Sequence, residues 1–148
     1  MTTSIDSPEC KHGWPVMHPQ PCSECEGEKD QPMKVYIAGP MRGIPNFNFP
    51  AFNIAASNLR WAGYTVFSPA ERDNQHHGTD ISAGNTTGDE DLAAKQHGFN
   101  LREALAADLE WICREADAIA LLPGWEKSKG ATAERAVALA LGLKEIYL

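Results

Sequence analysis

The sequence predicts an α/β domain built on an open, doubly wound parallel sheet with helices on both faces. Short runs rich in β-branched and aromatic residues alternate with longer segments whose apolar residues recur at three and four positions. This is the pattern of strands that alternate with helices. Ala118–Leu122 is apolar at every position, as strands inside a parallel sheet usually are. A chain of 148 residues is long enough for one such domain.

Most of the predicted elements have signals at their ends. We expect strands at 34–38, 64–67, 118–122 and 145–148, and helices at 49–62, 101–115 and 130–141. Pro50 suits the first turn of the first helix, which needs no N–H there, and Gly63 follows its last residue. Asn100 and Glu103 together form the start signal of the second helix. The residues expected to form the buried stripe of that second helix are Leu101, Leu105, Leu109 and Ile112. Cys113 is expected to be a buried small hydrophobe on the same helix.

Two stretches do not fit the alternation of strands and helices. Residues 74–96 are polar and rich in glycine, so we expect a long loop insert that is mobile or serves as a lid. Residues 1–32 hold three of the four cysteines and have no periodic apolar pattern. The chain therefore divides into a Cys/His-rich N-terminal segment, 1–32, and an α/β domain, 33–148.

The N-terminal segment is expected to hold a structural zinc ion. Cys10, His12, Cys22 and Cys25 form one C-x-x-C pair with a further cysteine and a histidine nearby, and zinc sites use such ligands. A short segment without its own core needs a cross-link, and in a reducing compartment a metal is favoured over a disulfide. His18 is an alternative ligand. An incidental cysteine-rich tail and a redox-active pair remain alternative interpretations.

Composition and charge exclude several classes of partner. The chain has 13 Lys+Arg against 20 Asp+Glu, a net charge of −7, and its arginines are scattered singly. Duplex nucleic acid is therefore not an expected partner, whereas a small anion held by one arginine and backbone amides is compatible with this charge.

The longest apolar run is too short to span a membrane. The first residues lack the features of a secretion signal, so we expect a cytoplasmic protein.

The expected ligand pocket lies at the carboxyl ends of the strands, where open parallel sheets bind ligands. The segments that should build it are 39–45, 69–73 and 123–134. Gly39 and Gly43 let the backbone approach a ligand closely, and Arg42 lies between them as a fork of donors. Ser128 and Gly130 open a helix, and free amides at a helix start bind anions. The alternative is that these are two ordinary strand–helix turns and a surface arginine.

Two carboxylates are candidates for chemistry in this pocket. Glu134 lies near the start of the last helix, so its side chain should lean back toward the pocket and stay ionised by the helix dipole. An ionised, positioned carboxylate can attack an anomeric carbon. Asp108 adjoins the apolar stripe of the preceding helix, and two carboxyls in one pocket have their pKa values pushed apart. The alternatives are helix capping for Glu134 and a solvated helix charge for Asp108.

Three motifs together resemble the nucleoside 2-deoxyribosyltransferase superfamily. They are YIAGPMRG at 36–43, the stretch 108–118 that begins DLEWI, and the stretch 128–142 that begins SKGATAE. The likeness covers roughly residues 34–148 and is nearest to the 2′-deoxynucleoside 5′-monophosphate N-glycosidases and to small uncharacterised relatives, many of them phage-encoded. It implies a flavodoxin-like fold with a parallel sheet of four to five strands.

The resemblance also implies roles for individual residues. Glu134 matches the nucleophile of the family, Asp108 matches an aspartate that handles the leaving base and the sugar, and Tyr36 matches a tyrosine that orients the nucleophile. Ser128 and Arg42 match residues that contact the 5′-phosphate in the monophosphate hydrolases. We therefore expect an enzyme that hydrolyses the N-glycosidic bond of a deoxynucleotide or transfers its deoxyribose, without a cofactor for catalysis.

The resemblance further implies a homo-oligomer, such as a dimer, because small members of the family share sites between subunits. A non-catalytic protein that binds or sequesters nucleotides on the same scaffold is the alternative. A purely structural role with a vestigial pocket is a third interpretation.

Overall fold

The fold is seen in a computed structural model that describes residues 31–148. Its centre is a sheet of four strands in the order β2-β1-β3-β4, all of them parallel. The strands are β1 (Lys34–Ala38), β2 (Thr65–Phe67), β3 (Ala118–Leu121) and β4 (Lys144–Tyr147). The predicted α/β fold with a parallel sheet is therefore confirmed, and the sheet has the lower of the two expected strand numbers.

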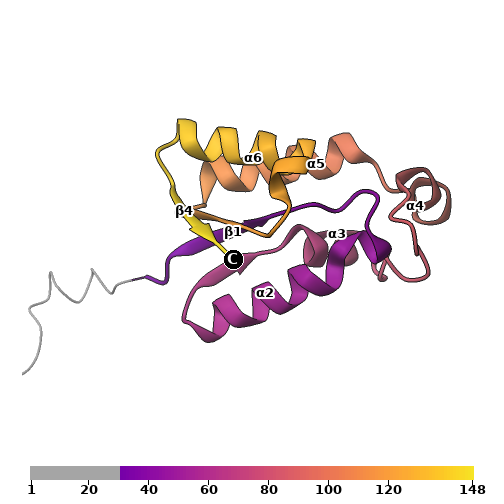
Figure 1. The fold of residues 1–148 in the computed structure, drawn as a ribbon, viewed down its shortest axis with the longest axis horizontal. Helices are drawn as coiled ribbons and strands as arrows, with labels where there is room; N and C mark the ends of the chain where they lie inside the picture. Colours follow the sequence, from indigo (N-terminus) through magenta and orange to yellow (C-terminus); the bar gives the residue numbers. More distant parts are fainter. Residues whose placement is uncertain (1–30) are drawn as a thin grey trace, which may run out of the picture. The chain divides into compact units, whose positions relative to one another are not determined.

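Helices cover both faces of this sheet (Figure 1). They are α2 (Phe49–Trp61), α3 (Pro69–His77), α4 (Glu90–His97), α5 (Leu101–Arg114) and α6 (Lys129–Ala140), with short 3-10 turns at η1 (Pro45–Asn48) and η2 (Trp125–Lys127). In Figure 1, α5 and α6 lie on one side of the sheet and α2 and α3 lie on the other. This doubly wound arrangement follows from the alternation of strands and helices along the chain.

The two apolar cores follow directly from the two-residue period of β1. Val35 and Ile37 face the core shared with α2, where Phe52 is fully buried. Tyr36 and Ala38 face the core shared with α5 and α6. Since successive side chains of a strand point to opposite faces, one strand supplies both layers. Tyr36 therefore belongs to the layer between the sheet and α6.

The buried face of α5 differs from the predicted one. The residues that are buried are Ala104, Asp108 and Ile112, which recur every four positions. Leu101 is exposed and Leu105 is only half-buried. Leu109 is half-buried and packs against the same core as Ile112, so the predicted stripe is confirmed at Ile112, in part at Leu109, and is wrong at Leu101. The prediction for Cys113 is also wrong, because its side chain is exposed. Cys113 follows Ile112 by about 100° around the helix, which turns it toward solvent.

The expected long loop at 74–96 is only partly present. Helix α3 extends to His77, and α4 begins at Glu90. Between them, Ile81, Ser82 and Asn85 are buried. The Asn85 side chain donates to Asp89 O at 2.8 Å and accepts from Asp89 N–H at 2.9 Å. These local bonds order residues 78–89, which we call the 78–89 segment. The segment has no apolar periodicity, so the sequence pattern did not reveal this order.

The 78–89 segment is attached to the loop that follows β1. The Gly43 amide donates to Gly88 O at 3.0 Å, and the Asn46 amide donates to Asn85 O at 2.8 Å. Gly88 has a φ of +64°, and a Cβ there would lie 2.4 Å from Ile44 O. Only glycine permits both this conformation and this approach. The segment is thus a fixed part of the fold in this structure.

Among the helices of residues 31–148, none is long and apolar enough to cross a membrane.

Candidate active site

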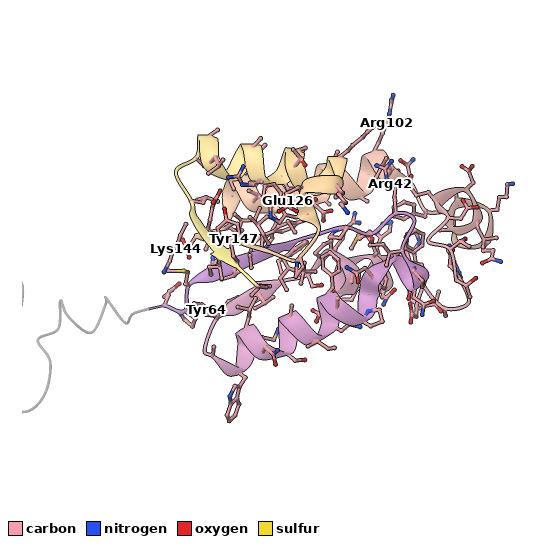
Figure 2. The ribbon with its side chains drawn as sticks, viewed as in Figure 1. Arg42, Tyr64, Arg102, Glu126, Lys144 and Tyr147 are labelled. Atoms are coloured by element: carbon pink, nitrogen blue, oxygen red, sulfur yellow. The ribbon has the colours of Figure 1, made fainter. Side chains whose placement is uncertain are left out.

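A cavity of about 630 Å³ lies at the carboxyl ends of the strands. Residues from all three predicted segments, 39–45, 69–73 and 123–134, line it, so the predicted location is confirmed. The first turns of α5 also line the cavity, and of these residues the sequence indicated only Asp108. It did not indicate the other lining residues, which are Phe47, Phe49, Phe52, Ile81, Glu90 and Phe99. Figure 2 shows Arg42 at this end of the molecule, whereas Tyr64 and Lys144 lie at the opposite end.

Glu134 and Tyr36 meet inside the domain, where the cavity reaches Glu134. The Tyr36 hydroxyl donates a hydrogen bond to Glu134 Oε1 at 2.9 Å. Tyr36 has no exposed surface, and its ring stacks on Phe67, which in turn stacks on Trp111. Glu134 lies just over one turn into α6, is buried, and lines the cavity as expected. The aromatic cluster thus fixes the hydroxyl against the carboxyl group.

Asp108 lines the same cavity as Glu134. It is 6% exposed, and its Oδ1 receives no hydrogen bond from any residue of 31–148. Helices α5 and α6 pack against each other, which brings the two carboxyls to one site. Asp108 is therefore not the solvated helix charge of the alternative interpretation. A buried polar atom without a partner is costly unless a ligand or a proton satisfies it.

The protonation of Glu134 differs from the expectation. Burial raises the pKa of Glu134 from 4.5 to about 8, the charge of Asp108 adds to this rise, and the Tyr36 hydrogen bond opposes it. The pKa therefore rises in spite of the favourable helix dipole, which contradicts the expectation that the dipole keeps Glu134 ionised. Burial, and then the charge of Asp73, raise the pKa of Asp108 to about 7. The two carboxyls together hold about one proton between pH 7 and pH 8.

A third carboxylate, Asp73, was missed by the sequence analysis. It lies on α3, is 4% exposed and lines the cavity. Arg72 forms an ion pair with one of its oxygens, and Arg72 Nη2 also donates to Glu103 O at 3.3 Å. Its position one turn after Pro69, within a segment predicted to form the pocket wall, was the available signal.

The start of α6 offers several hydrogen-bond donors to the cavity. Ser128 caps the helix, with its Oγ accepting from the Ala131 amide at 3.1 Å, and its hydroxyl proton remains a donor. The amides of Lys129 and Gly130 lie in the first turn, where a helix supplies no acceptor. Ser128, Lys129 and Gly130 all line the cavity, as does Lys127. The arrangement is that of an anion site at a helix start.

Arg42 lines the cavity, but it already has a partner. Its Nε forms an ion pair with Glu90, the first residue of α4, and about half of its side chain is exposed. Gly43 has a φ of +73° and its amide is bound to Gly88. At Gly39, a Cβ would lie 2.7 Å from Leu122 Cβ. Packing at the end of β3 therefore accounts for Gly39 without a ligand.

The loop between β1 and α2 is conformationally strained where it borders the cavity. Asn46, Phe47 and Asn48 have φ values of +54°, +51° and +59°, a conformation that costs non-glycine residues of order 1–3 kcal/mol each. The Asn48 side chain donates to Pro40 O at 3.0 Å, and Phe47 is buried in the cavity wall. Such strain is found most often at ligand sites.

The predicted zinc ligands Cys10, His12, Cys22 and Cys25, with the alternative His18, lie outside the described residues. Within residues 31–148 there is no group of three His, Cys, Asp or Glu side chains placed to hold a metal ion.

Comparison with known proteins identifies a family. Residues 33–147 match the model of a family described as a domain of unknown function, DUF4406. No curated protein and no solved structure matches the chain. Since the match spans nearly the whole of the α/β domain described above, the chain belongs to the DUF4406 family.

Proposed function

We propose that this pocket cleaves the N-glycosidic bond of a 2′-deoxynucleoside 5′-monophosphate, with Glu134 as the nucleophile. The observation that carries the proposal is the buried hydrogen bond from Tyr36 to Glu134, in a cavity that Asp108 also lines. Two carboxyl groups with distinct pKa values in one cavity are what glycoside cleavage requires. The motifs that resemble the deoxyribosyltransferase superfamily contain these same three residues.

The reaction follows from the roles of the two carboxyls. The Glu134 carboxylate attacks C1′ of the sugar, the bond from C1′ to the base nitrogen breaks, and the base leaves with a proton from Asp108. A water molecule then attacks C1′ and gives a proton to Asp108, which releases deoxyribose 5-phosphate and restores Glu134. A second base in place of water would give transfer.

The reactive state needs the shared proton on Asp108, although Glu134 has the higher pKa. The pKa of Glu134 is raised to about 8 and that of Asp108 to about 7, so moving the proton from Glu134 to Asp108 costs free energy. Part of the rise at Glu134 comes from the charge of Asp108, and that part vanishes when Asp108 takes the proton.

The start of α6 is the proposed phosphate site. The amides of Lys129 and Gly130, the Ser128 hydroxyl and the Lys127 side chain line the cavity there. A phosphate that also binds Arg42 has to exchange with the Glu90 carboxylate, since Glu90 now occupies the guanidinium. Both partners of that ion pair are partly exposed, so the exchange costs little.

The test is release of free base from a panel of deoxynucleoside monophosphates, followed by chromatography. We expect turnover by the native chain and a loss of about 10²-fold or more in Glu134→Gln. Glu126→Gln is the matched control, because Glu126 is an exposed residue (Figure 2). Unchanged base release by Glu134→Gln, or no release by the native chain from any monophosphate, contradicts the proposal.

Binding without turnover is the second candidate function. The raised pKa of Glu134 favours it, because a protonated carboxyl group is not a nucleophile. It predicts that calorimetry detects monophosphate binding while no base appears over hours. Both functions require nucleotide binding, so both predict that a nucleotide raises the melting temperature of the protein. If no nucleotide raises it, both functions are contradicted.

A further inference from the structure

One part of the cavity wall comes from α3, from α5 and from the chain between them. We call it the α3–α5 wall, and its members are Asp73, Ile81, Phe99, Ala104 and Leu105. All of these are apolar except Asp73. Helices α3 and α5 are in contact, so a base that leaves C1′ beside Asp108 on α5 would lie next to this wall. The ring faces of a base suit the apolar members, and its polar edge meets Asp73.

Asp73 is held as a hydrogen-bond acceptor that faces the cavity. One carboxylate oxygen is paired with Arg72, which is itself anchored by its bond to Glu103 O. Among residues 31–148, no hydrogen bond reaches the other oxygen. The side chain is more than nine-tenths buried and lines the cavity. Burial raises the pKa of Asp73, and the hydrogen bond and charge of Arg72 oppose that rise. In the ionised form, which the pair with Arg72 stabilises, the carboxylate only accepts hydrogen bonds, so it selects groups that donate them.

We propose, on the basis of the function proposed above, that Asp73 accepts a hydrogen bond from an exocyclic amino group of the base. The substrates are then the monophosphates of cytosine, adenine or guanine, in preference to those of uracil or thymine. Uracil and thymine place a carbonyl oxygen where cytosine has its amino group. Two acceptors then face each other, and each loses its hydrogen bond to water. The one ring N–H that uracil and thymine could offer to Asp73 is flanked by two carbonyl oxygens, and the Asp73 carboxylate repels both of these oxygens.

The pair dCMP and dUMP gives the sharpest test, because the two bases differ only at C4, which carries an amino group or an oxygen, and at the neighbouring N3, which carries a proton in uracil alone. We expect the native chain to cleave dCMP with a kcat/KM about 10²-fold or more above that for dUMP, since a buried acceptor is left unpaired by dUMP. The pair dAMP and dIMP should show the same preference.

Asp73→Asn separates base recognition from a structural role. An amide can turn its NH₂ toward a carbonyl oxygen, so this variant should narrow the ratio of dCMP to dUMP by about tenfold or more. A purely structural effect lowers both rates equally and leaves the ratio unchanged. Asp91→Asn, an exposed residue on α4, is the control with the same change of charge.

Binding to Glu134→Gln measures base recognition without turnover and without any change at Asp73. We expect dCMP to bind at least tenfold more tightly than dUMP in calorimetry. Equal cleavage or equal binding of dCMP and dUMP overturns the inference alone, as does an unchanged ratio in Asp73→Asn. Selective binding by the native chain with no base release supports the inference and overturns the proposed function. Absence of both binding and cleavage overturns both.

Discussion

Replacing Glu134 by glutamine should make the protein more stable at alkaline pH. Burial raises the pKa of Glu134 above the 4.5 of an ordinary glutamate, so the folded state binds this proton more tightly than the unfolded state does. The stability that the protonated carboxyl contributes is complete below pH 4.5 and is lost as pH rises through about 8. Glutamine keeps an oxygen for the Tyr36 hydrogen bond but never ionises, so it avoids this loss.

The size of the effect follows from the same pKa shift. From 4.5 to about 8, at about 1.4 kcal/mol for each unit, the loss has an upper limit of about 5 kcal/mol. Structural relaxation and water entry reduce such values, so a gain of about 2 kcal/mol in Glu134→Gln at pH 9 already agrees with the structure. At pH 4.5 the two proteins should differ by less than about 1 kcal/mol.

Urea unfolding at pH 4.5, 7 and 9 measures this difference directly. Glu126→Gln is the control, since its exposed side chain gives no reason for a pH-dependent gain. If Glu134→Gln is destabilised at pH 9, or if its advantage over the native chain does not grow with pH, the carboxyl is not held neutral by burial. The account of the shared proton would then be wrong.

The remaining predictions concern the candidate site, the 78–89 segment and the N-terminal cysteines. Base release by the native chain should show a bell-shaped pH dependence with limbs near pH 7 and 8. Tyr36→Phe should lower kcat by about tenfold or more. The same variant should move the upper limb to higher pH, because the Tyr36 hydrogen bond lowers the pKa of Glu134. Gly88→Ala should lower the free energy of unfolding by about 2 kcal/mol more than Gly78→Ala does, since both glycines have a positive φ, +64° and +68°, but only a Cβ at Gly88 meets other atoms. Equal losses in the two variants contradict the close approach at Gly88. Elemental analysis of the full chain should find about one zinc per molecule, and Cys22→Ser should remove it. An unchanged metal content in this variant excludes the predicted zinc site.

Much of the fold could be predicted because its signals are local. The strands at 34–38 and 118–122 are stretches of apolar and β-branched residues, and the predicted bounds agree with β1 and β3 to within one residue. Asn100 accepts hydrogen bonds from the amides of Arg102 and Glu103, as a helix cap should. The 78–89 segment could not be predicted, because side-chain bonds of Asn85 and the close approach of Gly88 leave no periodic trace.

The location of the candidate site was also predictable, whereas its electrostatics were not. Parallel strands place their carboxyl ends at one edge, which brought Glu134 and Asp108 to the same cavity. The pKa values depend on how deeply each group is buried, and burial depends on the whole fold. The three- and four-residue spacing of apolar residues on α5 predicted that its leucines face inward. In the structure Asp108 is one of the buried residues of this helix, whereas its leucines are not fully buried. Asp73 lies in a segment predicted to form the pocket wall, but the helix that turns its side chain inward was not predicted, so it could not be told from the charged residues beside it.

The stacked rings behind Tyr36 connect the interior of the protein to its chemistry. Neither Phe67 nor Trp111 borders the cavity, yet their stacking determines where the Tyr36 hydroxyl points. A substitution at either ring that the fold tolerates would still tilt this hydroxyl away from its acceptor. If the proposed function holds, activity therefore depends on two residues that do not line the cavity, and substitutions at Phe67 or Trp111 affect the site through the position of Tyr36.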